Sequence, residues 1–140
     1  MPRTHKDVEE GAKFALDWNK MNKVVACGQP LVPVAVQDAD SKEVLLIAYV
    51  NKFALDHTLA TGNATFWSTS RNELWEKGAT SGDYLKIVEI RVNCEQNSLL
   101  YLVRPAGQGA CHTKGGDGKA RRGCYYRSLV NGALQMCDNA

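Results

Sequence analysis

Two segments of the chain have the hydrophobic period of an amphipathic helix. Residues 52–61 form one of them, with Asn51 able to accept a hydrogen bond from the free amides at its start. Gly62 can end that helix in the left-handed conformation. Over the first twenty residues, a further helix is predicted by apolar residues that recur every three or four positions: Val8, Ala12, Ala15 and Trp18.

The middle of the chain alternates between apolar runs and polar breaks, which is typical of strands. The runs LVPVAVQD and VLLIAYV flank four polar residues, so they predict a hairpin. Pro33 lies inside the first run, and we expect that strand to start at or near a sheet edge, because proline donates no backbone hydrogen bond. Three more strands are predicted, and the glycine-punctuated ELWEKGATSGD predicts a connection. The three strand segments are ATFWSTS, YLKIVEIRV and SLLYLV.

These patterns predict a single α+β domain over residues 1–140, with strands dominant and helices few. A length of 140 residues suits one hydrophobic core and is short for two. Hydrophobic residues make up 44% of the chain and charged residues 23%, which excludes disordered and fibrous classes. We interpret residues 1–30 as a helical N-terminal segment.

Charge and cysteine content narrow the class of protein only a little. The net charge of +2 fits an anionic small molecule as well as a weak nucleic-acid surface. No apolar stretch approaches the roughly 20 residues of a membrane helix, and the start lacks the apolar segment of a secretory signal. We therefore expect a cytoplasmic protein without a membrane partner. Its five cysteines then stay reduced and serve as metal ligands, reactive thiols or buried side chains.

Residues 93–97 are a polar interruption between two apolar runs and a candidate metal site. If the strand stayed extended here, Asn93, Glu95 and Asn97 would share one face and Cys94 the other. Oxygen ligands suit magnesium and thiolates suit zinc, so this strand could border two metal sites. Polar residues on a hairpin are, however, more often simply solvated.

Three cysteines and one histidine form a second candidate set: Cys94, Cys111, Cys124 and His112. Sulfur and nitrogen ligands suit tetrahedral zinc, and a catalytic zinc leaves one position to water. The chain has no Cys-x-x-Cys pair, so the spacing also allows scattered buried thiols. Because neighbouring side chains diverge, His112 fits an acid or base beside the metal better than a ligand shared with Cys111. Cys27 and Cys137 are interpreted as ordinary thiols.

The stretch around Trp75 has the residue types of a phosphate site. Hydroxyls, loop amides and a guanidinium can together hold phosphate. Trp75 could stack on a base or lie in the core. The candidate residues are Ser68, Ser70, Arg71, Trp75, Lys77, Gly78, Ser81 and Gly82. Further on, the basic residues of 114–127 with Tyr125 and Tyr126 could contact nucleic acid, although such a run is more often a solvated loop near an anionic ligand.

Taken in order, these segments resemble the phosphoribosyl-AMP cyclohydrolase family of histidine biosynthesis. The resemblance runs from about residue 31 to residue 127 through LVPVAVQD, VLLIAYVN, FWSTSR, LWEKGATSG, the polar residues 93–97, GACHT and CYYR. It implies hydrolysis of the adenine ring of N1-(5-phosphoribosyl)-AMP at C6, with cleavage of the N1–C6 bond. It also implies a swapped homodimer with a partly barrel-like sheet, and zinc and magnesium as cofactors.

The resemblance assigns roles to individual residues. It implies that cysteines from both subunits bind one zinc ion, that His112 relays protons, and that Thr113 joins the substrate-binding residues. The zinc ligands would be Cys94, Cys111 and Cys124, while Asn93, Glu95 and Asn97 stand where the family binds magnesium.

The chain also departs from the family pattern. The family has D-C-D-x-D where this chain has Asn93-Cys94-Glu95-Gln96-Asn97, so we expect weaker magnesium binding there or none. Thr69 replaces a usual arginine and Ala79 a usual glutamate. Residues 114–123 form an inserted basic loop between two cysteines, which we expect to contact phosphate. Two alternatives stay open: a zinc hydrolase of a related phosphorylated purine or amidine, and a zinc-stabilised RNA-binding module, for which a nucleic-acid partner is less expected.

Overall fold

The computed structural model describes residues 4–137 and contains short helices and more numerous strands. The elements are α1 (His5–Glu10), α2 (Lys20–Ala26), β1 (Val32–Asp38), β2 (Val44–Val50), α3 (Lys52–Thr61), β3 (Thr65–Ser68), β4 (Glu73–Glu76), β5 (Leu85–Val92), β6 (Leu99–Pro105), β7 (Arg127–Val130) and β8 (Ala133–Met136). The predicted strand-dominated α+β class is confirmed. No sheet within residues 4–137 closes into a barrel, so the partly barrel-like expectation is wrong for a single chain.

The main sheet has four strands in the order β2-β1-β6-β5. β1 pairs antiparallel with β2, which confirms the hairpin, and parallel with β6. The expectation of an edge at Pro33 is wrong, because β1 is an interior strand. The ladder between β1 and β6 starts only at Val34, opposite Leu99, so the missing amide of Pro33 costs no hydrogen bond to β6.

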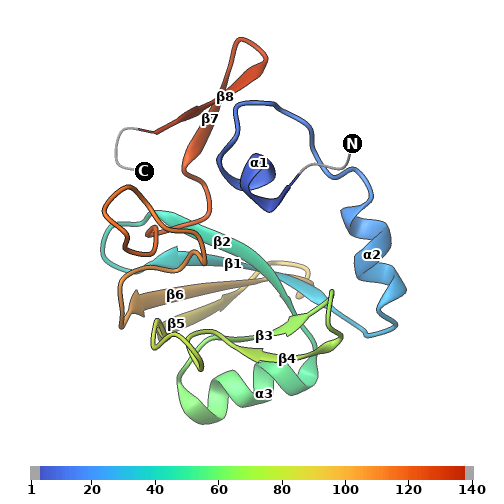
Figure 1. Ribbon diagram of the computed structural model, residues 1–140. Coiled ribbons are helices and arrows are strands. Elements are labelled where there is room, and N and C mark those ends of the chain that lie inside the picture. Colours follow the sequence, from blue (N-terminus) through green and yellow to red (C-terminus); the bar gives the residue numbers. More distant parts are fainter. Residues whose placement is uncertain (1–3, 138–140) are drawn as a thin grey trace.

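The core lies between this sheet and the layer of α3, β3 and β4 below it in Figure 1. Tyr101 of β6 and Phe66 of β3 are fully buried, and their rings stack with centroids 6.1 Å apart. Helix α3 has the predicted bounds: Asn51 Oδ1 accepts from the Ala54 amide at 3.0 Å, and Gly62 ends the helix at a φ of 75°. Local capping therefore sets this helix.

The β3–β4 hairpin corrects one sequence-based expectation. ELWE, expected as part of a connection, forms β4 and pairs antiparallel with β3, with Phe66 opposite Trp75. The glycines come after it, at the turn formed by residues 77–82. This hairpin carries the loop of residues 69–72 at one end and Lys77 at the other.

The N-terminal segment is not the single helix that its hydrophobic period predicts. Helix α1 ends at Glu10, and residues 12–13 lie beside β8: Ala12 O accepts from the Leu134 amide at 2.7 Å, and Lys13 forms an antiparallel bridge with Ala133. Pairing with the C-terminal hairpin therefore overrides the local helical preference. Figure 1 shows α1 beside β7 and β8 above the main sheet. We call α1, residues 11–13 and the β7–β8 hairpin the terminal layer.

Among the described residues, no helix has the length and apolar content required to cross a membrane.

Candidate active site

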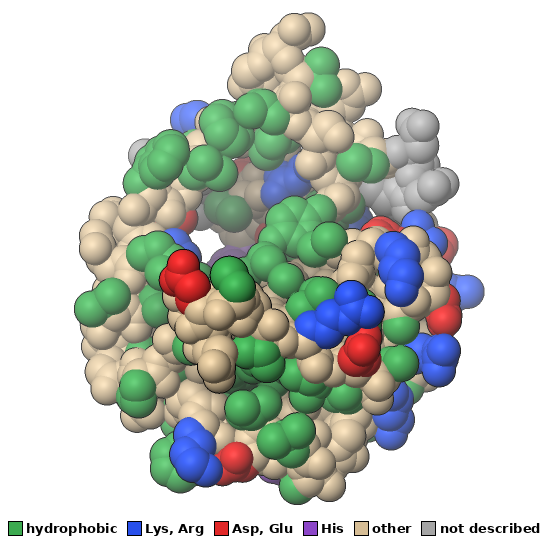
Figure 2. Space-filling view, turned by 180° about the vertical axis from the view of Figure 1, so that it is seen from behind, with side chains coloured by type: hydrophobic (Ala, Val, Ile, Leu, Met, Phe, Trp, Pro, Cys, Tyr) green, Lys and Arg blue, Asp and Glu red, His purple; other side chains and the backbone are tan. Residues whose placement is uncertain are grey.

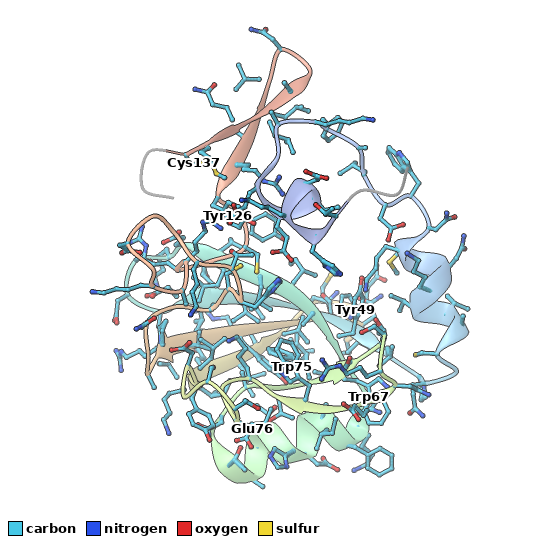
Figure 3. The ribbon with its side chains drawn as sticks, viewed as in Figure 1. Tyr49, Trp67, Trp75, Glu76, Tyr126 and Cys137 are labelled. Atoms are coloured by element: carbon cyan, nitrogen blue, oxygen red, sulfur yellow. The ribbon has the colours of Figure 1, made fainter. Side chains whose placement is uncertain are left out.

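A cleft of about 750 Å³ lies between the β3–β4 hairpin and residues 108–120. Trp75 of β4 contributes to its wall, and Figure 3 shows this side chain in the middle of the molecule above the hairpin. The structure brings seven of the predicted site residues to this cleft: Arg71, Trp75, Lys77, Gly78, Ser81, Cys111 and His112. Lys77 is only 6% exposed, so its ammonium group sits within the protein.

The other predicted binding residues lie around the cleft. Ser68 and Ser70 line a separate hollow of about 200 Å³, which shares Trp75 with the cleft. Their hydroxyls lie 3.4 Å apart, and Ser68 Oγ accepts from the Arg71 amide at 3.3 Å. Gly82 has a φ of 83° and donates its amide to Gly78 O at 2.8 Å, so it shapes the turn. Thr113 is buried behind the cleft wall.

Cys111 and Cys124 form a thiol pair at the inner side of the cleft. The two side chains share a hydrogen bond, and the Thr113 hydroxyl lies 2.9 Å from Cys111 Sγ. Backbone bonds fix both positions: the Cys111 amide donates to Arg121 O at 3.1 Å and the Cys124 amide to Leu45 O at 2.7 Å. The loop of residues 112–123 therefore folds back and brings together the two thiols at its ends.

The surroundings of this pair favour one thiolate. The thiol of Cys124, donating to Cys111, lowers the pKa of Cys111 to about 5, although burial opposes the shift; Thr113 and nearby His112 add to the lowering. The pKa of Cys124 is raised because its proton is held in that same bond, while the charge of Lys77 acts in the opposite direction. The pair thus holds one negative charge in the form that binds zinc.

Cys94 does not join this pair within one chain. It lies in the turn between β5 and β6, next to the end of the sheet where Leu99 pairs with Val34. The thiol pair is bound to Leu45, at the opposite end of the sheet, where the start of β2 pairs with the end of β1. Within residues 4–137, no three His, Cys, Asp or Glu side chains of one chain gather as a metal site. The described residues of one chain therefore bring two thiols together beside the cleft.

The segment of the sequence that forms this cleft matches a known protein family. The family model of phosphoribosyl-AMP cyclohydrolase matches residues 46–126, which include β3, β4, the thiol pair and His112. The chain belongs to the phosphoribosyl-AMP cyclohydrolase family.

Individual members of this family are similar to the chain over most of their length. A phosphoribosyl-AMP cyclohydrolase of Sphingopyxis alaskensis is 50% identical over 112 residues, covering 79% of this chain and 83% of the relative. One from Halobacterium salinarum is 49% identical over 102 residues, covering 73% and 74%. One from Brucella anthropi is 42% identical and covers 99% of this chain and 94% of the relative, so the similarity extends beyond the matched core.

The polar residues 93–97 form a turn. The expectation that they continue the strand is wrong: β5 ends at Val92, and Gln96 has a φ of 55°, which an extended strand does not allow. Asn93 Oδ1 accepts from the amides of Asn97 and Ser98, both at 2.9 Å. The three oxygen-bearing side chains nevertheless meet, because Asn93 Nδ2 donates to Asn97 Oδ1 at 2.6 Å and Asn97 Nδ2 to Glu95 Oε2 at 3.2 Å.

This turn fits magnesium poorly. Magnesium needs several oxygen ligands in near-octahedral geometry and is usually bound through one or two carboxylates. In the turn only Glu95 carries charge, and the amide oxygens of Asn93 and Asn97 already accept hydrogen bonds within the turn. A bound ion would have to replace these bonds.

His112 lies at the cleft, with its side chain 78% exposed. Its Nε2 is 2.9 Å from Glu9 Oε1 of α1. Glu9 was not among the residues predicted from the sequence, and no sequence signal pairs it with His112, because the two lie 103 positions apart.

The basic residues of 114–123 are only partly available to a ligand. Lys114 lines the cleft. The guanidinium of Arg121 is 8% exposed and lies 4.2 Å from the centroid of the Tyr126 ring, and Arg122 pairs with Glu43 at 3.3 Å. These contacts leave little of the continuous basic surface that an RNA-binding module needs. Cys27 and Cys137 are free thiols outside the pair.

Proposed function

We propose that this enzyme hydrolyses N1-(5-phosphoribosyl)-AMP, adding water at C6 of the adenine ring and breaking the N1–C6 bond, as a step of histidine biosynthesis. One observation carries the proposal: Cys111, which is hydrogen-bonded to Cys124, lies with His112 at a cleft built from the segment that matches the family. The product would be the corresponding phosphoribosyl-formimino imidazole carboxamide nucleotide. A cytoplasmic location stays a prediction.

Zinc fits the donor chemistry of the pair. Cys111 and Cys124 would hold it with Cys94 of a second subunit, and the bound ion would supply a water of lowered pKa and polarise the ring. The turn of residues 93–97 of one subunit would thus reach the cleft of the other. The proposed site would therefore be shared within a homodimer, since the described residues of one chain bring only two of the three sulfurs together.

The cleft residues would bind and orient the nucleotide. Trp75, 44% exposed at the cleft, offers an aromatic face to the adenine ring. Arg71 and Lys77 offer positive charge from the two ends of the β3–β4 hairpin, which suits a substrate with one phosphate at each end. Ser68, Ser70, Ser81 and Lys114 add hydrogen-bond donors around these charges.

His112 would move the proton that ring opening requires. When the N1–C6 bond breaks, N1 takes up a proton, and the imidazole can deliver it from the open side of the cleft. The buried ammonium of Lys77 keeps the inner wall positive, which favours both the thiolate and a phosphate.

Turnover and metal content test this function directly. We expect purified protein to carry about one zinc ion per chain and to convert phosphoribosyl-AMP in an absorbance assay. Chelation should abolish turnover, and added zinc should restore it. Full turnover by the metal-free protein would contradict the proposal. No turnover of phosphoribosyl-AMP together with turnover of another phosphorylated purine would instead support the alternative hydrolase.

Magnesium is predicted to raise the Tm of the wild-type protein only slightly, because the turn of residues 93–97 fits the ion poorly. In the Asn93→Asp/Asn97→Asp variant, three carboxylates repel one another until a cation binds, so magnesium should stabilise the fold. Near tenfold excess over its Kd, the ion should raise the Tm of the variant by about 4 °C and that of the wild type by much less. Thermal unfolding with matched sodium salt as control checks this. An equal rise in both proteins would contradict this prediction.

A further inference from the structure

We propose that Glu9 of α1 is a positioning residue for His112: its carboxylate accepts a hydrogen bond from His112 Nε2 and fixes the orientation of the ring at the cleft. The contact is short, at 2.9 Å between Nε2 and Oε1. The inference rests on the role proposed above for His112, and it assigns a function to an N-terminal segment outside residues 46–126.

The position of Glu9 is set by backbone contacts on both sides of it. The Tyr126 hydroxyl donates to Glu9 O at 2.6 Å, and Arg127 Nη1 donates to Gly11 O at 3.0 Å. A capping box at the start of α1 adds two bonds, with the Thr4 hydroxyl accepting from the Asp7 amide and the Asp7 carboxylate from the Thr4 amide. Figure 3 shows Tyr126 beside α1.

This arrangement decides which group orients the other. A partly exposed pair such as Glu9 and His112, with side chains 29% and 78% exposed, contributes little to stability. The Glu9–His112 pair therefore does not hold α1 in place. Side-chain burial does not hold it either, because the described residues of α1 bury no side chain. Hydrogen bonds from the side chains of Tyr126 and Arg127 to backbone carbonyls hold the helix. The Glu9 carboxylate is therefore already in place, and the His112 imidazole is the group that the contact orders.

The hydrogen bond also selects a tautomer. A carboxylate only accepts, so Nε2 must carry the hydrogen, and in the neutral ring Nδ1 then keeps the lone pair. At metal sites, removing the group that accepts a hydrogen bond from a metal-binding histidine typically lowers activity by about 10- to 100-fold. The neighbouring charged groups are His5, whose Nδ1 lies 4.0 Å from Glu9 Oε1, and the Glu10–Arg121 pair at 3.8 Å.

The terminal layer also encloses the far side of the thiol pair. A cavity of about 380 Å³ lies between residues 8–17 and residues 124–134, with Cys124 in its wall. Figure 2, the view from behind, shows a hollow between the upper and lower parts of the molecule, with hydrophobic and Lys or Arg side chains along it. Glu9 therefore belongs to a segment that already lies over the site.

The first test compares Glu9→Ala with Glu10→Ala, which removes a carboxylate from the same helix without touching His112. Nitrogen-15 NMR of the His112 ring reads the tautomer without any need for turnover. We expect Nε2–H to dominate in the wild type and in Glu10→Ala, and this preference to be lost in Glu9→Ala. An unchanged ring spectrum in Glu9→Ala would overturn the proposal, whether or not phosphoribosyl-AMP is the substrate.

The second test is kinetic. We expect Glu9→Ala to lower kcat by about 10-fold with KM unchanged within about twofold. Glu9→Gln, which keeps the accepting oxygen, should recover most of the loss. In a His112→Ala background, Glu9→Ala should cost nothing further. A full additional loss in that background would mean that Glu9 acts independently of His112, and would overturn the proposal. Absence of turnover in the wild type would instead contradict the proposed function, with the NMR result still deciding the role of Glu9.

Discussion

Mixing the Cys94→Ser and Cys111→Ser variants restores activity that neither variant has alone. Each homodimer lacks one sulfur at both of its sites. In a mixed dimer, one site combines the intact Cys94 of one subunit with the intact Cys111 and Cys124 of the other. Random reassociation makes half of the dimers mixed, with one complete site each, so we expect about one quarter of the wild-type activity and zinc content.

The matched control mixes Cys111→Ser with Cys124→Ser. Both cysteines belong to the thiol pair of a single chain, so no mixed dimer contains a complete site, and activity should stay absent. Turnover after subunit exchange, together with zinc analysis, checks both mixtures. Restoration in the control, or none in the first mixture, would contradict a site shared between subunits.

His112→Ala is expected to lower kcat by about 10²- to 10⁴-fold while zinc content and Tm stay at wild-type values. The imidazole is exposed at the cleft and packs into no core cluster, so its removal should cost little stability. Its contribution lies in proton transfer to the leaving nitrogen, which water at the cleft replaces only poorly. Steady-state kinetics with metal analysis measures the effect.

The control for this variant is His57→Ala. His57 lies on α3, where its Nε2 is 3.4 Å from Glu76, and it does not line the cleft. This variant should keep wild-type kcat. Activity of His112→Ala within about twofold of the wild type would remove His112 from the reaction. Turnover is the deciding measurement for both variants, because nucleic-acid affinity does not report on catalysis.

The elements that the sequence predicts correctly are those whose structure short-range contacts decide. Helix α3 follows its prediction residue for residue, because Asn51 and Gly62 act within one turn of its ends. The main hairpin follows because β1 and β2 are joined by a short turn. The predicted cleft residues from Arg71 to Ser81 meet because a single hairpin carries them.

The incorrect predictions fall mainly where distant parts of the chain interact. Residues 12–13 lie in a segment with a helical period, but they pair with residues near the C-terminus, which no local pattern reveals. At residues 93–97 the extended alternation does not continue, because Gln96 turns the chain. The approach of Cys111 to Cys124 depends on a folded-back loop, and the approach of Glu9 to His112 on packing of the two ends of the chain.

The parallel pairing of β1 with β6 has a consequence for the order of folding. It joins Val34 to Leu99, so a long loop must close before the central ladder exists. Closing a long loop slows folding, because chain entropy is lost before the pairing of the two strands stabilises the structure. Leu45, which receives the Cys124 amide, follows β1 closely, whereas the thiols come after β6. Until the sheet forms, the bond from the Cys124 amide to Leu45 does not hold the thiol pair in place, so we expect an oxidising solution to form mispaired disulfides before the site is assembled.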